Sequence, residues 1–553
     1  MRDHWATQQL GTPTYFQVLS GHGSTLKHWA SHGLGLGSSQ RISISGLGTR
    51  LLALKPGDPT MAQDMARGKF SFAGATVTGI PVDVFDANPP SAEWAIALHN
   101  LSWLQHFVTG GHELHRIVAR SLVLKWGEQR GGIRTPMVCF QALISLASAA
   151  HFLLGPSPSS FGKPFYELVE KLIHRVLANH PSALSDSFWQ AVALQYASLA
   201  FRGSETLRDQ ANARLCTVMD QVILSDGGHV SRNPQALLEV LLAVIPIRDA
   251  MVAKREAVPQ ALSAAIERMF PMLRMLSHGD RGLGNFQGAG ASEMAGIKTL
   301  VEHDTIAGRP LHCAPHSGYC RLSHRSGLLI MDTGIPGECN SPLAIEFSDG
   351  PHRIFNNCGM PDSATDDWRR AAADIAAHNT VEITSFESGV KNNPTAEVIA
   401  SPQGSLINCS NEISGRSGRV IHHRSIFLSQ TGNDLRGEDR ISTAGSPNSP
   451  AGPLDFTIRF HLHPGVKATL TRKEMRIVLM LPNKTAWQFN ARGGIMSLED
   501  SVFLGDALGP RKTQQIVIRG STETADPVNW ALRRVEKSAA SPNDRVEMPQ
   551  LPF

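Results

Sequence analysis

The hydrophobic pattern changes once along the chain, from a helical period to a strand period. Between residues 93 and 277, apolar residues recur at helical spacing, in runs that Gly, Pro or Ser separate. We expect about eight amphipathic helices there, near residues 93–108, 112–127, 135–154, 164–179, 186–201, 205–223, 234–252 and 258–277. Helices of this kind pack as bundles, solenoids or rings. The N-terminal part is therefore predicted to be all-helical.

Short β runs follow between residues 318 and 535, with turn residues between them and no intervening helical pattern. Many strands at short spacing predict a large antiparallel sandwich. At 553 residues the chain is too long for one ordinary core, so we expect a multidomain protein, α and then β. We place the boundaries as follows: a flexible leader at 1–45, a helical domain at 46–300, a β-sandwich at 301–536 and a disordered tail at 537–553.

Charge and cysteine content narrow the possible partners. The net charge is +4, from 52 Lys and Arg against 48 Asp and Glu, so no strong basic field points to nucleic acid. The seven cysteines are scattered, odd in number and without a C-x-x-C pair, which indicates mostly free thiols rather than a zinc site.

Two stretches bear on membranes and compartment. Residues 138–154 lack charged side chains but contain Gln141, Ser145, Ser148 and His151, and they lie at the lower edge of the length that spans a bilayer. We predict a buried helix there and no integral membrane segment. The N-terminus lacks the apolar stretch of a secretion signal, which leaves the compartment open.

A polar, glycine-broken corner lies between two apolar helical runs at residues 224–235. Asp226, Gly227 and Gly228 should turn the chain, and Ser231 or Asn233 can cap the helix that begins near Pro234. The corner also presents His229, Arg232 and Asn233 together, a combination of side chains that suits an anionic ligand. The alternative is a capping corner with an incidental histidine.

Several motifs resemble the heparinase II/III-like polysaccharide lyases, from about residue 60 to residue 535. They are Leu98–Leu104 (LHNLSWL), Asp226–Pro234 (DGGHVSRNP), His316–Tyr319 (HSGY), Met331–Gly334 (MDTG), Ala377–Thr380 (AHNT), Leu435–Arg440 (LRGEDR) and Arg459–Pro464 (RFHLHP). The resemblance implies an incomplete (α/α) toroid joined to an antiparallel β-sandwich, with an acidic polysaccharide in the cleft between them. It also implies cleavage of that polymer by β-elimination.

β-Elimination at a uronate requires a group that neutralises the sugar carboxylate, a base for the C5 proton and an acid for the leaving oxygen. Redox or metal cofactors are not required, and we expect none. The resemblance makes His229 and Asn233 the neutralising groups, with Arg232 holding the sugar acid, and it matches His378 to the sandwich histidine of the family. Otherwise, His378 is a strand-end histidine bonded to the backbone.

Polar and aromatic residues near the first helix, His99, Asn100 and Trp103, are candidates for substrate binding. Helix caps and core aromatics also account for these residue types. A further candidate is Tyr319, as a proton carrier or as a plain strand aromatic, because the region that matches the family's catalytic tyrosine reads LGNFQG at Leu283–Gly288 and contains no tyrosine.

Two departures from the family bear on activity and on metal binding. Where relatives carry a His-rich segment, this chain has Glu338-Cys339-Asn340-Ser341-Pro342, and Asn357 replaces a frequent Asp. Losing these ligands argues against a structural zinc, so no metal is expected. The departures also favour an alternative function, a non-catalytic acidic-glycan-binding or envelope-assembly protein. The substrate class suggests the cell envelope or periplasm, and the oligomeric state is not indicated.

Overall fold

The computed structural model describes residues 42–129, 134–155, 159–203, 205–292, 294–304, 306, 310–361, 366–384, 386, 389–390, 395–415, 418–443, 452–471, 476–523 and 527–535. The expected tail at 537–553 and nearly all of the expected leader lie outside these residues. The chain divides into two compact units. Unit 1 comprises Met1–Ile223, Glu239–Ile266 and Lys298–His303, and unit 2 comprises Leu224–Leu238, Glu267–Ile297 and Asp304–Phe553.

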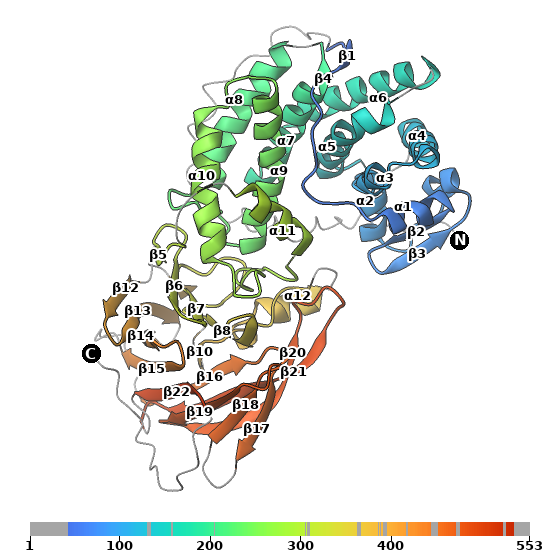
Figure 1. The fold of residues 1–553 in the computed structure, drawn as a ribbon. Coiled ribbons are helices and arrows are strands. Elements are labelled where there is room, and N and C mark those ends of the chain that lie inside the picture. The colour runs from blue at the N-terminus through green and yellow to red at the C-terminus, as the bar shows by residue number, and fades with distance from the viewer. Residues whose placement is uncertain are drawn as a thin grey trace. The chain divides into compact units, whose positions relative to one another are not determined.

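Unit 1 is built from helices, as the helical period predicted (Figure 1). A small hairpin of β2 and β3 lies against α1 and α2, and β1 pairs with β4. The elements are β1 (Gly46–Leu47), α1 (Pro59–Ala66), β2 (Lys69–Phe72), β3 (Ala75–Thr78), η3 (Pro81–Phe85), α2 (Ala92–His99), α3 (Leu104–Gly110), α4 (Glu113–Glu128), α5 (Pro136–Leu153), α6 (Ser159–Leu177), α7 (Leu184–Ala200), β4 (Phe201–Arg202) and α8 (Glu205–Val222). Three more helices follow in the chain: α9 (Pro234–Ala253), α10 (Gln260–Met275) and α11 (Met294–His303).

The first expected helix, 93–108, is two short helices instead. The chain breaks at Leu101, whose φ of 59° lies in the left-handed region that stops an α-helix. Asn100 is the C-cap of α2, and its side chain accepts a hydrogen bond from the Ser102 backbone N–H at 2.9 Å. The helical period continues across this break, so periodicity alone did not reveal it.

Helix α5 is the one described helix that is long and apolar enough to cross a membrane by length and composition. More than half of its residues are buried in the protein, and it packs against α3, α6 and α7. These contacts are those of a core helix in a helical domain.

Unit 2 holds three antiparallel sheets, in agreement with the predicted sandwich (Figure 1). Their strand orders are β5-β6-β7-β8-β9, β10-β16-β21-β20 and β11-β13-β14-β15-β22-β19-β18-β17, with β12 paired to β13. The strands are β5 (Cys313–Ala314), β6 (Tyr319–His324), β7 (Gly327–Asp332), β8 (Ile345–Asp349), β9 (His352–Phe355), β10 (Val381–Ile383), β11 (Gly389–Val390), β12 (Thr395–Ser401), β13 (Gly404–Gly415), β14 (Gly418–Ser429), β15 (Asp434–Thr443), β16 (Asp455–His461), β17 (Lys467–Thr471), β18 (Arg476–Met480), β19 (Ala486–Arg492), β20 (Ile495–Phe503), β21 (Arg511–Ser521) and β22 (Val528–Arg534). A short helix, α12 (Asp366–Ala373), and the turn η4 (Ile375–Ala377) precede β10.

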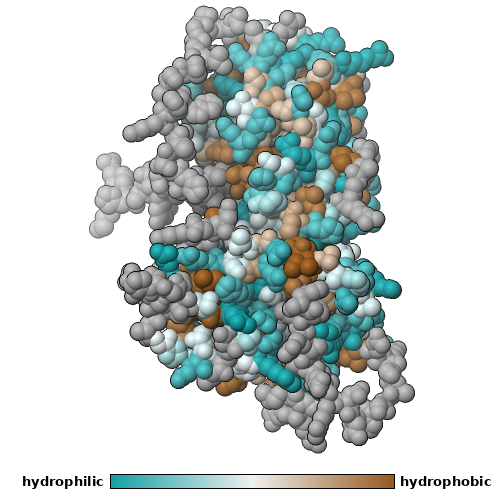
Figure 2. All heavy atoms as spheres, turned by 90° about the vertical axis from the view of Figure 1, so that its left-hand side faces the viewer, coloured by the Kyte–Doolittle hydropathy of each residue, from teal (hydrophilic) through white to brown (hydrophobic). Residues whose placement is uncertain are grey.

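One apolar core joins the three sheets of unit 2. Phe347 of β8, Phe460 of β16 and Trp530 of β22 belong to the same cluster of buried side chains. On the face shown in Figure 2, the described apolar residues at the surface form small separate groups among polar ones. The apolar side chains of this cluster pack the sheets together.

A charged pair is buried inside this apolar core. Asp439 of β15 accepts hydrogen bonds from Arg424 at 2.6 Å, from His422 at 2.8 Å and from the indole of Trp530 at 2.9 Å. Neither member of the Arg424–Asp439 pair has more than 1% of its side chain exposed. These partners hold the pKa of Asp439 below its usual range despite burial, so the carboxylate stays charged.

Replacing Asp439 by Asn should destabilise unit 2 strongly, because Arg424 would keep its charge without a counter-ion. Removing one member of a buried pair costs about 3–5 kcal/mol of the free energy of unfolding. Denaturant unfolding followed by tryptophan fluorescence measures this loss. The control is Glu438→Gln, whose partner Arg440 is half exposed, and it should change the stability by no more than about 1 kcal/mol. Equal stability of the two variants would contradict the assignment.

Candidate functional site

The corner at residues 224–235 is folded against the segment that leads into β6, and both belong to unit 2. Gly227 has a φ of 88°, which a residue with a side chain adopts only with strain. A Cβ on Gly228 would lie 2.0 Å from Ser317 Oγ, so only glycine fits there. The carboxylate of Asp226 accepts hydrogen bonds from His316 N (2.9 Å), Ser317 N (2.7 Å) and Ser317 Oγ (2.5 Å).

Asn233 begins α9, as predicted for a cap. Its Oδ1 accepts hydrogen bonds from Gln235 N at 2.8 Å and Ala236 N at 3.4 Å. Its Nδ2 is buried and has no hydrogen-bond partner among the described residues. An unpaired buried amide donor costs about 1–3 kcal/mol, so Nδ2 of Asn233 is a candidate for binding an acceptor outside the described residues.

His229 lies four residues before Asn233, the residue that caps α9. Its Nδ1 accepts the Ser231 backbone N–H at 3.1 Å and lies 2.7 Å from Ser231 Oγ. Burial lowers the pKa of His229 to about 4, so the imidazole is neutral at pH 7. With Nδ1 as an acceptor, the neutral ring carries its proton on Nε2, which is then a donor.

The guanidinium of Arg232 is committed to the protein. It forms an ion pair with Asp332 at the end of β7 and donates to the backbone oxygens of Ser317 (2.7 Å), Gly318 (3.2 Å) and Ile335. Its backbone is left-handed, with a φ of 62°. Arg232 therefore ties the corner to two loops of unit 2, and at most one of its five N–H donors is left for another partner.

Tyr319, the candidate proton carrier, is buried at the start of β6. Its hydroxyl donates to the backbone oxygen of Arg232 at 2.6 Å, and the Arg232 guanidinium lies 5.2 Å from its ring centre. Burial raises the pKa of Tyr319 well above its usual value, and nearby Asp332 raises it further. A phenol in this environment is a poor base near neutral pH.

His378 is buried just before β10, and neither ring nitrogen has a hydrogen-bond partner among the described residues. Burial lowers its pKa to about 4. The neighbouring Asn379 has several partners. Its Nδ2 donates to Ile345 O at 2.8 Å, its Oδ1 accepts from His461 N at 2.5 Å, and its backbone N–H donates to Asn357 Oδ1 at 2.9 Å. The backbone of Ala372 nevertheless acts on the His378 imidazole and opposes the lowering of its pKa, which is the kind of backbone contact expected of a strand-end histidine.

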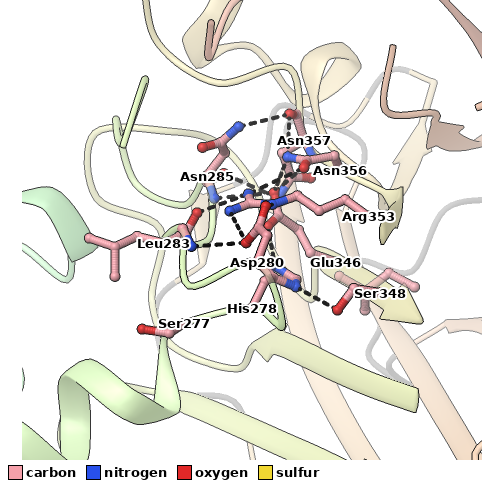
Figure 3. Close-up of polar contacts among 12 residues, drawn as sticks. Ser277, His278, Asp280, Leu283, Asn285, Glu346, Ser348, Arg353, Asn356 and Asn357 are labelled. Atoms are coloured by element: carbon pink, nitrogen blue, oxygen red, sulfur yellow. Dashed lines mark hydrogen bonds and ion pairs between the residues drawn. The ribbon is translucent and has the colours of Figure 1, made fainter. Parts of the chain in front are cut away.

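A buried polar network holds the segment after α10 against β8 and β9 (Figure 3). Glu346 is at its centre, because its carboxylate accepts hydrogen bonds from four groups: His278 Nε2 (2.8 Å), Asn285 N (3.2 Å), Asn356 Nδ2 (2.8 Å) and Asn357 N (2.9 Å). Burial raises the pKa of Glu346 to about 7. On the same side, Arg353 pairs with Asp280 at 2.8 Å.

Asn357, which replaces the family's frequent Asp, is part of this network. Its Nδ2 donates to Asn285 O at 3.2 Å and its Oδ1 accepts from Asn379 N at 2.9 Å. An aspartate could accept but not donate, so the amide is the group that fits both contacts. Among the described residues, no group of three or more His, Cys, Asp or Glu side chains is arranged to hold a metal ion.

Glu338 was not predicted as a site residue, because its segment was considered only as the place where the family's histidines are missing. Glu338 lies on the loop after β7. Two side chains hold this loop: Arg232 donates to Ile335 O, and Gln287 Oε1 accepts from the backbone N–H groups of Gly337 (2.9 Å) and Cys339 (3.4 Å). The Glu338 carboxylate lies over Gly288, where a Cβ would be 2.3 Å from its Oε2. Burial raises its pKa to about 7. The sequence feature that could have indicated Glu338 was an acidic side chain within the segment 338–342, where this chain differs from the family.

The three candidates in unit 1 are engaged in local structure. Trp103 is buried and its indole donates to Leu98 O at 2.8 Å. His99 packs on Phe85, and its backbone oxygen accepts from the Trp126 indole at 3.2 Å. These contacts account for Trp103 as a core residue and for Asn100 as a cap, whereas Nδ1 of His99 is buried without a partner among the described residues.

Comparisons with known proteins agree with this architecture. Residues 306–531 match the model of the "Heparinase II/III-like, C-terminal" family. The chain is 28% identical over 531 residues to FtsZ-localized protein C of Caulobacter vibrioides, covering 89% of this chain and 91% of that protein. Among solved structures, heparinase III superposes with a TM-score of 0.70 at 12% identity, covering 91% of this chain and 88% of that one. A heparan sulfate lyase HepC mutant from Pedobacter heparinus superposes with a TM-score of 0.62 at 13% identity, covering 87% of this chain and 83% of that one.

The helical region followed by antiparallel sheets is therefore the toroid-plus-sandwich fold of these lyases. Residues 306–531 thus carry the heparinase II/III-like C-terminal domain, and the chain as a whole shares the fold of heparinase III.

Proposed function

We propose that this protein is a polysaccharide lyase that cleaves a uronic-acid-containing polymer by β-elimination. The supporting observation is that Nδ2 of Asn233 and both ring nitrogens of His378, which lie in two of the motifs, are among the buried polar atoms of unit 2 without partners among the described residues. Others are the side-chain amide of Asn411 and Nδ1 of His422. Each such group costs about 1–3 kcal/mol unless a ligand satisfies it. Related chains of the same fold bear the names heparinase III and heparan sulfate lyase.

The neutralising role falls to Asn233 and His229. Nδ2 of Asn233 and the protonated Nε2 of neutral His229 donate hydrogen bonds to the uronate carboxylate without adding negative charge. Withdrawing charge from that carboxylate makes the C5 proton more acidic, which is the difficult part of the reaction.

Proton transfer falls to neutral His378 and to Glu338. A base works best when its pKa lies near the working pH, and the pKa of Glu338 is raised to about 7 by burial. His378 can accept a proton on one nitrogen and donate from the other. In this proposal Arg232 and Tyr319 are positioning residues, because their donors are already bonded to the protein.

Replacing Asn233 by Asp separates its two roles. The carboxylate keeps an acceptor for Gln235 N, so α9 remains capped, but the donor toward the substrate becomes a negative charge. We expect a loss of at least about 10²-fold in kcat, the cost of removing one donor to a developing negative charge, with little change in Tm. The assay follows the unsaturated product by its ultraviolet absorbance. No such product from the wild type with a broad panel of uronate polymers would refute the proposed function.

The pH profile tests Glu338. A carboxyl base is active only when deprotonated, so the activity of the wild type should rise with pH through about 7. Glu338→Gln should remove that rising limb and lower the rate by about 10²-fold or more. The control is Glu412→Gln, which changes a carboxylate paired with exposed Arg419 and should leave the profile as it is. An unchanged limb in Glu338→Gln would exclude Glu338 as the base.

A second candidate is a non-catalytic protein that binds an acidic glycan or takes part in envelope assembly. It is favoured by the buried, bonded hydroxyl of Tyr319. It is also favoured by the long match to a relative named for its localisation with FtsZ rather than for an activity. Binding of a uronate polymer without turnover, together with co-sedimentation with FtsZ filaments, would select this candidate. Turnover of the same polymer would reject it.

A further inference from the structure

Two of the seven cysteines face each other across the first strand pair of unit 2. Cys313 of β5 and Cys320 of β6 are direct partners in the antiparallel register. The neighbouring pair, His312 and Arg321, is joined by a backbone hydrogen bond from Arg321 N to His312 O of 2.8 Å. Because hydrogen-bonded and non-hydrogen-bonded pairs alternate along an antiparallel ladder, the two cysteines occupy a non-hydrogen-bonded position. Cα atoms at such positions are about 4.5 Å apart, which is within the range that a disulfide bridges. The two sulfur atoms are 2.7 Å apart.

The two thiols differ in access and acidity. Cys320 is buried, whereas Cys313 is partly exposed. The hydrogen bond from the Cys320 thiol lowers the pKa of Cys313, and the same contact, with burial, raises the pKa of Cys320. An accessible thiol with a lowered pKa next to a second thiol is the arrangement of a reactive and a resolving cysteine.

We propose that Cys313 and Cys320 form a reversible disulfide, and that small-molecule disulfides such as oxidised glutathione are its oxidants. The Cys313 thiolate attacks one sulfur of the oxidant, whose S–S bond breaks and releases one glutathione thiol. Cys320 then loses its proton and attacks Sγ of Cys313, which releases the second glutathione. The protein loses two electrons and two protons, and the oxidant gains them.

The bridge would close the chain segment that holds the corner at residues 224–235. Between the two cysteines lie Ser317, which bonds Asp226, and Tyr319, whose hydroxyl bonds Arg232 O. A cross-link at the base of this short loop restricts its opening. Oxidation should therefore stiffen the corner that carries His229 and Asn233, while reduction releases it.

The test uses the full-length protein equilibrated in glutathione buffers of increasing oxidation, followed by alkylation of free thiols and peptide mapping without reduction. We expect a cross-linked peptide containing both cysteines, which dithiothreitol removes. Hydrogen exchange at 314–319 and 226–233 should slow in the oxidised form. In Cys320→Ser, a glutathione adduct should accumulate on Cys313, because nothing resolves it.

The matched control is Cys216→Ser, which removes another partly exposed thiol, on α8, and should leave the cross-link intact. The proposal is overturned if both cysteines stay alkylated in native protein under oxidising buffer. It is also overturned if Cys320 pairs with Cys409, or if Cys313 carries a stable adduct in the wild type. None of these outcomes depends on lyase activity.

Discussion

The arrangement of the candidate site depends on the ion pair between Arg232 and Asp332. Arg232 sits in a left-handed backbone conformation that costs about 1 kcal/mol or more, and its guanidinium offsets this by binding Asp332 and three backbone oxygens. Asp332 in turn accepts from Gln287 at 2.7 Å. One side chain thus fixes the corner before α9, the entry to β6 and the loop that carries Glu338.

A second buried charge positions the segment next to His378. Arg424, neutralised by Asp439, donates to the backbone oxygens of Leu343 (2.8 Å) and Asn379 (2.9 Å). The LRGEDR motif, one of the seven that carried the resemblance to the lyases, therefore acts through the fold. Its Asp439 keeps the Arg424 cation in place, and that cation holds the segment next to His378. Similarity in this motif therefore indicates a shared fold, and not a shared catalytic activity.

The fold could be predicted from the sequence because the hydrophobic period changes from helical to alternating along the chain, and the glycine-broken corner has the residue types of a turn and a cap. Asn233 as a cap followed from local rules. What the sequence did not reveal are long-range partners: Arg232 faces Asp332, 100 residues away, and Tyr319 donates to the backbone of Arg232. Glu338 was overlooked because its raised pKa arises from burial, which a sequence pattern does not encode.

Asn233 illustrates why a motif can outlast an activity. Its oxygen caps α9, while its nitrogen has no partner among the described residues. A lineage that lost catalysis would therefore still lose stability at the start of α9 if it lost this residue. Surveys that count this asparagine as a marker of active enzymes would then include descendants that only bind. What distinguishes active enzymes from such descendants is what Nδ2 of this asparagine binds, and not the presence of the asparagine.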